Sequence, residues 1–400
     1  MLSELEAQRL VENYMKVEGL TTSTQDILDS GEIPRLKGYT VRPGKVSDSI
    51  FSGRGSFAID KEKEDEYRAL LKGKNITAWD YFTVEEKGKL KEKVKISFEN
   101  PPLNTYDETP LRVMVRTQRI STHDITRGEI PFKDQILALN HHFMWRLLRN
   151  TLGTSQYEVP GLSDNSVVIA AENLQQIAFE NVFRAYMAKS TTDTSLYQAY
   201  VVRGERKFAG HDLPEGLFGN GPLPYVMDTP STKSDIHDIT VDPQYLFDNG
   251  ICTPQQYKQI VNSGLVAFGI ASYFLRERGI IAVDTKTEHG INMKGEIVSQ
   301  DEIWTMDSSR FWLLDDYNAQ MERFLRSEIP EINPRSFSKE FARGFSEGDK
   351  GYTEEQRIAI AVRYIIGIQH LLGQRFEPDM RTRDERVIKG LETVVEQLIA

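Results

Sequence analysis

The chain has 400 residues, of which 49 are Lys or Arg and 59 are Asp or Glu, so its formal net charge is −10. Its length predicts two domains, or one large domain with additions. The single cysteine, Cys252, excludes a disulfide framework, a multi-cysteine zinc site and a cysteine-ligated iron–sulfur cluster. The acidic balance argues against nucleic acid as a partner.

Membrane insertion and secretion are not predicted. The most apolar stretch, residues 264–275, is too short to span a bilayer. The N-terminal segment carries acidic residues from position 4 onward, unlike a signal peptide. We therefore expect a cytoplasmic protein with no membrane partner.

In chain order, the first half of the sequence predicts a helix, a β-rich region and a second helix. Residues 3–16 have helical periodicity, and residues 39–57 combine β-formers with glycines, which favours a hairpin. The charge-rich insert 61–98 is expected to form exposed helices with a solvated face. Further predictions are a buried strand at 111–121, a helix at 134–152 and a strand at 167–171.

The second half predicts one long helix, a hairpin and a helical tail. Thr253 is expected to cap a helix that ends by Gly279, and residues 280–304 to form a hairpin that turns at 292–295. The tail predicts helices at 338–346, 353–372 and 382–399. Strands early and helices late indicate an α+β fold of two lobes.

The 280–304 hairpin carries the most informative candidate site. Because side chains alternate along a strand, Asp284, Lys286 and Glu288 share one face, and folding back brings Asp301 roughly opposite Lys286. Carboxylates so placed suit Mg²⁺ completed by substrate phosphates, and the lysine suits a phosphate. The alternative is a cross-strand ion-pair ladder on a solvated face.

Two further polar segments are candidates for anion binding. Arg310, in the run 307–310 (DSSR), can clamp a phosphate, although Asp–Arg pairs in loops are commonly structural. The run 229–233 (TPSTK) places hydroxyls beside Lys233, as in an anion cradle or, slightly preferred on these residues alone, a helix N-cap.

The remaining chemistry-bearing residues give weaker signals. The run 42–45 (RPGK) is not a phosphate-binding P-loop, because Val46 stands where Ser or Thr must follow the lysine. A glycine turn that covers phosphates stays possible there. His141 and His142 lie mid-helix, where one is expected to pack and the other to face water, and Cys252 is expected to be structural.

Eight segments, taken in order, match one known family. They are GKVSD at 44–48, RISTHD at 119–124, ENL at 172–174, ENVFRAYMAKS at 180–190, LPEGL at 213–217, TPSTK at 229–233, VDTKTEHG at 283–290 and DEIWTMDSSRFW at 301–312. Together they resemble the SAICAR synthetase (phosphoribosylaminoimidazole-succinocarboxamide synthase) family from about residue 37 to 315. The additional segments look like those of a long-chain variant.

The resemblance implies ATP-dependent amide formation between the carboxylate of carboxyaminoimidazole ribotide and the amine of L-aspartate, with ATP in a cleft between two α+β lobes. It implies four segments: an N-terminal extension (1–36), a nucleotide-binding lobe (37–172, with the insert 61–98), a substrate and metal lobe (173–330) and a helical tail (331–400). The tail is expected to cover either a homo-oligomer interface or only the core.

The resemblance also assigns roles to individual residues. Glu288 and Asp301 become the Mg²⁺ carboxylates, and Asp284, Lys286 and Arg310 become catalytic, with Arg310 also clamping phosphate. Nucleotide contacts fall on Gly44, Lys45, Val46, Glu172, Asn173 and Leu174. Substrate contacts fall on Arg184, Ser190, Ser231, Lys233 and Asp238.

The chain departs from the family pattern at several positions. Gln118 replaces an aspartate, Ser47 an arginine, Ala185 and Lys189 two glycines, and Thr287 and His289 two aromatic residues. These departures keep two alternatives open beside SAICAR synthesis. One is a divergent ligase that joins another carboxylate and amine, and the other is a nucleotide-binding protein without catalysis.

Overall fold

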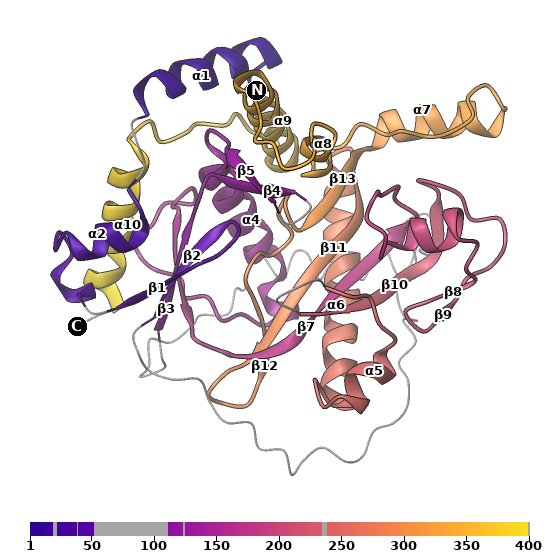
Figure 1. The fold of residues 1–400 in the computed structure, drawn as a ribbon, viewed down its shortest axis with the longest axis horizontal. Helices are drawn as coiled ribbons and strands as arrows, with labels where there is room; N and C mark the ends of the chain where they lie inside the picture. The colour runs from indigo at the N-terminus through magenta and orange to yellow at the C-terminus, as the bar shows by residue number, and fades with distance from the viewer. Residues whose placement is uncertain (19–21, 38, 52–110, 123–124, 234–237, 399–400) are drawn as a thin grey trace.

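The structure is a computed structural model that describes residues 1–18, 22–37, 39–51, 111–122, 125–233 and 238–398 (Figure 1). The predicted insert helices at 61–98 lie outside these residues. The helices are α1 (Glu4–Val17), α2 (Thr24–Asp29), the 3₁₀ helix η1 (Pro34–Leu36), α4 (Lys133–Leu152), the π-helix η4 (Gln198–Val202), α5 (Pro243–Asp248), α6 (Pro254–Arg276), α7 (Leu314–Leu325), α8 (Glu340–Arg343), α9 (Glu354–Leu372) and α10 (Arg383–Leu398).

The strands form two main antiparallel sheets, which makes the fold α+β. They are β1 (Thr40–Pro43), β2 (Ser47–Phe51), β3 (Leu111–Arg116), β4 (Arg119–Thr122), β5 (Ile125–Glu129), β6 (Val168–Glu172), β7 (Gln175–Tyr186), β8 (Lys207–Phe208), β9 (His211–Asp212), β10 (Pro222–Thr232), β11 (Ile280–Ile291), β12 (Ile297–Gln300) and β13 (Ser309–Leu313). The first sheet has the order β1-β2-β3-β6, and the second has β10-β7-β11-β12 with β13 also on β11.

Most predicted elements are confirmed, one is wrong, and one helix was missed. The glycine-turn hairpin is β1–β2, and the second hairpin is β11–β12. The single strand predicted at 111–121 is two strands, because β3 joins the first sheet whereas β4 pairs with β5. The helix α7 was not predicted.

Four helices stack in layers behind the second sheet. The helix α6 packs on β11, α4 packs on α6, α9 packs on α4, and α1 packs on α9 (Figure 1). Their buried faces form one hydrophobic core with β7, β11 and β13. The predicted tail therefore covers this core through α9.

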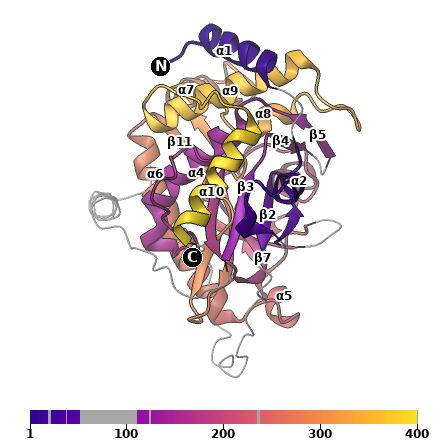
Figure 2. The ribbon, with the colours of Figure 1, turned by 90° about the vertical axis from the view of Figure 1, so that its left-hand side faces the viewer.

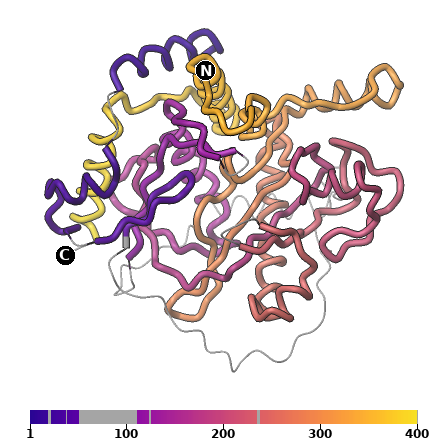
Figure 3. Tube along the Cα trace, viewed as in Figure 1, coloured from indigo at the N-terminus to yellow at the C-terminus, as the bar shows by residue number. Residues whose placement is uncertain are grey.

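The C-terminal helix α10 covers the first sheet instead. It packs against β6, and its Val387 and Leu391 share a second core with Ile27 and Leu28 of α2. Figure 2 shows α10 lying across this side of the molecule. In Figure 3 the indigo segment that contains α2 and the yellow segment that contains α10 lie side by side.

The long helix α6 begins and packs as its residues dictate. Thr253 Oγ1 accepts the Gln256 N–H at 3.0 Å, and Gln256 Oε1 accepts the Thr253 N–H at 2.8 Å, which completes a capping box. A Cβ at Gly264 would lie 2.0 Å from the Phe183 ring, so glycine is required where α6 crosses β7. Within the described residues, no helix combines the length and apolar character needed to cross a membrane.

Several histidines and the single cysteine are buried inside the protein. His141 and His142 are both buried, so the prediction that one faces water is wrong. Cys252, the single cysteine, is buried, as a structural residue would be. His289, on β11, is buried as well.

Stability is expected to fall as the pH drops from about 6.5 to 4. Burial lowers the pKa of His289 and of His142 to about 4, so unfolding takes up protons in this window. Each histidine then costs up to about 3 kcal/mol of stability at low pH. His289→Phe, which restores an aromatic ring, should flatten the pH dependence of the urea unfolding midpoint between pH 7.5 and 5.

The half-buried His370 supplies the control for this prediction. Its pKa is also lowered by burial, but its ring is only partly covered where it stacks on Phe337. His370→Phe should flatten the pH dependence less than His289→Phe. Equal slopes for wild type and His289→Phe would contradict the buried, neutral state of His289.

Candidate functional site

Two lysines and two glutamates meet where β10, β7 and β11 lie side by side. Glu180 of β7 is directly opposite Glu288 of β11 in the strand register. The Lys286 ammonium lies 2.9 Å from Glu180 Oε2 and 3.1 Å from Glu288 Oε1. Lys233, just after β10, lies 2.7 Å from Glu288 and 3.2 Å from Glu180. We call these four residues the lysine–glutamate cluster.

Burial and opposite charges set the protonation states of this cluster. Burial alone would raise the pKa of Glu288, but Lys286 and Lys233 outweigh it and hold that pKa at about 2. Burial would lower the pKa of Lys286, whereas Glu288, Glu180 and Asp301 together raise it well above its ordinary value. Glu288, Lys286 and Lys233 therefore stay charged at neutral pH.

A second charged group lies two residues back along β11. Asp284 has Arg184 of β7 opposite it on one side and Arg310 of β13 opposite it on the other. Arg184 Nη1 lies 3.0 Å from Asp284 Oδ2, and Arg310 Nε donates to Asp284 Oδ1 at 2.9 Å while its Nη2 bonds Oδ2. We call these three residues the arginine pair on Asp284.

This second group leaves one positive charge uncompensated among its three members. Burial would raise the pKa of Asp284, but Arg310 and Arg184 lower it, so the carboxylate stays ionised. Arg184 Nε also donates to Thr229 Oγ1 at 3.0 Å, and Arg310 Nη1 donates to the Lys189 carbonyl at 3.2 Å. Two fixed guanidinium groups with a net positive charge suit an anionic ligand such as a phosphate.

The structure revises how the carboxylates are grouped. Asp284, Lys286 and Glu288 alternate along β11 as predicted, but Asp284 forms ion pairs with two arginines and is not grouped with Glu288. Asp301 is not in the strand ladder: β12 ends at Gln300, which pairs with Glu288, and Asp301 turns away with φ 61°. It still lies close enough to Lys286 to raise that residue's pKa. The alternative of an ion-pair ladder is right about cross-strand ion pairs, which Lys286 of β11 forms with Glu180 of β7, and wrong about the solvated face, since Glu288 is only 7% exposed.

Arg310→Lys is expected to weaken binding of a phosphate-bearing substrate by about 10- to 100-fold. The planar guanidinium of Arg310 donates to both Asp284 and the Lys189 carbonyl, and a lysine ammonium cannot reproduce that arrangement. The measurement is the KM of the ribotide that the sequence resemblance implies as substrate. Because net charge is preserved, the unfolding temperature should change little. An unchanged KM would contradict the anion-binding assignment of Arg310.

Sequence reasoning missed Glu180 and part of the tail. Glu180 is four residues before Arg184 on β7, so strand alternation places both on one face. Two charged residues of α8 act on the arginine pair on Asp284: Arg343 lowers the pKa of Asp284, and Glu340 raises the pKa of Arg310. Burial lowers the pKa of the neighbouring Lys339 to about 8. The tail thus borders the arginine pair on Asp284.

Arg310 lies on β13 and not in a loop, and the loop just before β13 is held by α4 and α9. The Lys133 ammonium lies 2.8 Å from Asp307 Oδ2 with both side chains buried, and the Tyr364 hydroxyl donates to Asp307 Oδ1. In addition, the Lys286 N–H donates to the Ser308 carbonyl at 2.9 Å. These contacts fix Arg310 relative to β11.

The predicted nucleotide residues lie in two other places. Gly44, Lys45 and Val46 form the turn between β1 and β2, where a Cβ on Gly44 would lie 2.4 Å from the Ser47 carbonyl oxygen. Glu172 ends β6, and Asn173 and Leu174 lead directly into β7. Glu172 Oε1 accepts the Met293 N–H from the β11–β12 turn at 3.3 Å.

The remaining predicted substrate residues are not all brought together. Ser231 is buried on β10 opposite Glu180, next to the lysine–glutamate cluster. Ser190 lies beyond the end of β7, where its hydroxyl accepts the Thr192 N–H at 3.2 Å. Asp238 is exposed, and it is separated from Lys233 by residues 234–237, which the structure does not describe.

Two departures from the family pattern have a structural setting near Arg310. Ala185 is buried on β7. Lys189 places its ammonium 2.6 Å from Glu331 Oε2 and 3.1 Å from Asn333 Oδ1, on the segment after α7. The extra charge of Lys189 is therefore compensated by a residue of the tail.

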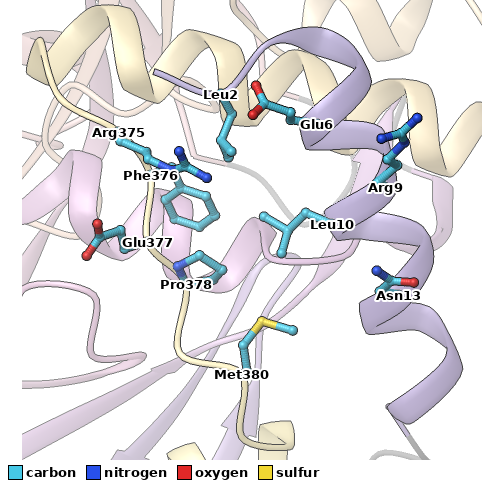
Figure 4. Close-up of a pocket in the computed structure, with 10 residues that line it drawn as sticks. All are labelled: Leu2, Glu6, Arg9, Leu10, Asn13, Arg375, Phe376, Glu377, Pro378 and Met380. Atoms are coloured by element: carbon cyan, nitrogen blue, oxygen red, sulfur yellow. The ribbon is translucent and has the colours of Figure 1, made fainter.

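A groove of about 700 Å³ lies elsewhere, between α1 and the segment before α10. Figure 4 shows the apolar side chains of Leu2, Leu10, Phe376 and Pro378 gathered across it, with charged side chains around them. No residue of the lysine–glutamate cluster or of the arginine pair on Asp284 lines this groove.

Taken together, the structure is an α+β protein in which two groups of paired charges lie on β7, β11 and β13 and just after β10. The chain belongs to the SAICAR synthetase family, which it matches over residues 76–358.

Named relatives agree with this family. The chain is 32% identical over 304 residues to the chloroplastic phosphoribosylaminoimidazole-succinocarboxamide synthase of Arabidopsis thaliana, with 73% of this chain and 71% of the relative covered. It is 32% identical to the same enzyme of Legionella pneumophila (strain Lens), with 69% of this chain and 87% of that enzyme covered.

Solved structures agree with the fold. The SAICAR synthase of Saccharomyces cerevisiae in complex with SAICAR superposes with a TM-score of 0.59 at 19% identity, covering 90% of this chain and 99% of that one. A SAICAR synthetase in complex with ADP gives a TM-score of 0.50 at 21% identity, covering 69% and 96%.

Proposed function

We propose that this protein is an ATP-dependent ligase that joins carboxyaminoimidazole ribotide to L-aspartate and forms SAICAR, ADP and phosphate in purine biosynthesis. The family and the names of the relatives supply the reaction. The observation that carries the proposal is the placement of the lysine–glutamate cluster and the arginine pair on Asp284 two residues apart on one strand, β11. A ligase that brings a phosphoryl group to a carboxylate needs such cations, because its reactants are all anions.

The reaction divides into two balanced steps. A carboxylate oxygen of the ribotide attacks the γ-phosphorus of ATP, the bond to the bridging oxygen breaks, and an acyl phosphate and ADP result. The amine of aspartate then attacks the acyl carbon, phosphate leaves with the C–O electron pair, and the nitrogen loses a proton. In this scheme Lys286 faces the transferred phosphoryl group, and Arg184, Arg310 and Ser190 hold the ribotide phosphate.

The remaining predicted residues are assigned either to ATP or to the substrate side. We assign the turn at Gly44, Lys45 and Val46 and the segment from Glu172 to Leu174 to ATP. Lys233, Ser231 and Asp238 are assigned to the substrate side. Lys233 fits this assignment through its contact with Glu288, whereas the exposed Asp238 is supported by the family resemblance.

Mg²⁺ fits the oxygen donors near Lys286. Within the described ranges, no three His, Cys, Asp or Glu side chains gather in a metal-binding arrangement. Mg²⁺ bound by one or two carboxylates and by substrate phosphates does not require three. Glu288 and Asp301 would hold the ion, which would neutralise phosphate charge during transfer.

The test is ADP release by the purified protein with ATP, Mg²⁺, the ribotide and L-aspartate, omitting each component in turn. Release that requires both the ribotide and aspartate supports the proposal. ATP binding without turnover would indicate a nucleotide-binding protein instead.

A second candidate is a ligase of the same fold that acts on another carboxylate and amine. The Lys189–Glu331 ion pair favours it, because it adds two charges beside the segment assigned to the ribotide. A screen of carboxylate and amine pairs with ADP readout distinguishes the two candidates.

A further inference from the structure

The three residues 117–119 connect the β1–β2 turn to the N-terminal helix. Successive side chains of an extended chain point to opposite sides. Thr117 donates to the Val46 carbonyl with both its N–H, at 3.0 Å, and its Oγ1, at 2.9 Å. Arg119 Nη2 donates to the Gly44 carbonyl at 2.8 Å. Both outer residues of the segment therefore hold the turn.

Arg119 also joins the hairpin to both ends of the chain. The same Nη2 lies 2.5 Å from Asp48 Oδ1 on β2. The other oxygen of Asp48 accepts from Thr24 Oγ1 of α2 at 2.6 Å. Arg383 of α10 donates to Thr24 Oγ1 at 3.3 Å and to the Thr22 carbonyl at 2.8 Å. Asp48, Thr24 and Arg383 are all buried, so these bonds are shielded from water.

The middle residue, Gln118, points the other way, to α1. Its side-chain N–H group donates to the Tyr14 hydroxyl at 3.0 Å and to Glu18 Oε1 at 3.1 Å. Tyr14 also accepts from Arg386 of α10 at 3.0 Å, and Arg386 bonds Asp134 of α4 at 2.8 Å. Gln118 stands where the family has an aspartate, and a carboxylate there would face the Glu18 carboxylate with the same charge. The neutral side chain of Gln118 is therefore compatible with the Glu18 carboxylate at the end of α1, whereas an aspartate would be repelled by it.

We propose that Arg119 is a positioning residue for the nucleotide, and that α1 and α10, acting through Gln118, Thr24 and Arg383, fix the β1–β2 turn over the bound ATP. This inference rests on the proposed function, since it takes the turn at Gly44, Lys45 and Val46 as the nucleotide-covering element. Its new content is that the two terminal segments, distant from the lysine–glutamate cluster, set nucleotide affinity.

The test compares affinity for MgADP, measured by calorimetry without any other substrate, across a set of variants. Arg119→Met removes the bonds to Gly44 and Asp48 and should weaken MgADP binding about tenfold. Arg119→Lys keeps one charged nitrogen, which can serve both acceptors, and should restore most of the affinity. Gln118→Met removes the contact with α1 at similar side-chain length and should weaken binding about threefold.

Substrate kinetics and a surface control separate positioning from general damage. In Arg119→Met and Gln118→Met the KM of ATP should rise while the KM of the ribotide stays within about twofold. Arg203→Met breaks the exposed Arg203–Glu205 pair. It should change neither the affinity for MgADP nor the KM of ATP or of the ribotide.

Three outcomes would overturn the inference. The first is MgADP affinity that stays at the wild-type value in both Arg119→Met and Gln118→Met. The second is a parallel rise of both KM values with a lower unfolding temperature, which indicates a structural role only. The third is a wild-type protein that binds no MgADP, which also overturns the proposed function, whereas the first two leave that function intact.

Discussion

Asp284→Asn is expected to lower kcat/KM for ligation by about two to three orders of magnitude, because breaking a buried ion pair by removing one partner costs roughly 3–5 kcal/mol. Asp284 is the only carboxylate that the described contacts place between Arg184 and Arg310. An amide cannot hold both guanidinium groups, so their positions relative to β11 are lost. The measurements are kcat/KM for the ribotide and the urea unfolding midpoint, which should also fall.

An exposed ion pair provides the matched control. Asp164 binds Arg146 at 2.8 Å, with side chains 49% and 39% exposed. Asp164→Asn makes the same chemical change and should alter kcat/KM less than about twofold, since exposed pairs contribute little. Asp284→Asn activity within tenfold of wild type would show that the arginines are positioned without this carboxylate.

Glu288→Gln is expected to cut turnover by orders of magnitude and to raise the Mg²⁺ concentration needed for half-maximal rate. The change removes a proposed Mg²⁺ ligand and the carboxylate that binds both Lys233 and Lys286. The measurement is the rate of ADP release over a Mg²⁺ titration at saturating ATP and substrates.

Glu180→Gln separates the two roles of Glu288. Glu180 lies opposite Glu288 and binds the same two lysines, but it is not among the proposed metal ligands. Turnover should fall in both variants, whereas the Mg²⁺ dependence should shift only in Glu288→Gln and in Asp301→Asn. Near-normal turnover of Glu288→Gln at limiting Mg²⁺, or the same Mg²⁺ shift in Glu180→Gln, would refute the metal assignment.

The sequence predicted those elements whose signals are local. The Thr253 capping box, the glycine turn at Gly44 and the hairpin turn at 292–295 each depend on residues a few positions apart. The helix α7 lacks a capping residue, since it follows β13 directly and Leu313 at its N-cap makes no capping bond. Its local signal, Asp315 and Asp316 in the first turn, is weaker than a capping box and was missed.

The candidate site was predictable along β11 but not across the sheet. Alternation placed Asp284, Lys286 and Glu288 on one face. The partners of these residues depend on strand order, and β7 lies between β10 and β11, so Glu180 joins the lysine–glutamate cluster, whose other members lie far along the chain at Lys233, Lys286 and Glu288. The position of Asp301 outside the strand was also not predictable from alternation. Asp301 itself has a positive φ, and β12 ends at the preceding residue, Gln300.

The layer in which α1 packs on α9 has a consequence for the synthesis of the chain. The Leu2 N–H donates to the Gln369 side chain at 2.7 Å, and Gln369 donates back to the Leu2 carbonyl at 3.1 Å. Ala7, Val11 and Tyr14 of α1 are completely buried. The helix α1 leaves the ribosome long before α9 exists, so its apolar face stays without its partner while the residues between the two helices are translated. The contacts of α1 with α9 therefore form only after nearly all of the core that α9 covers has been synthesised.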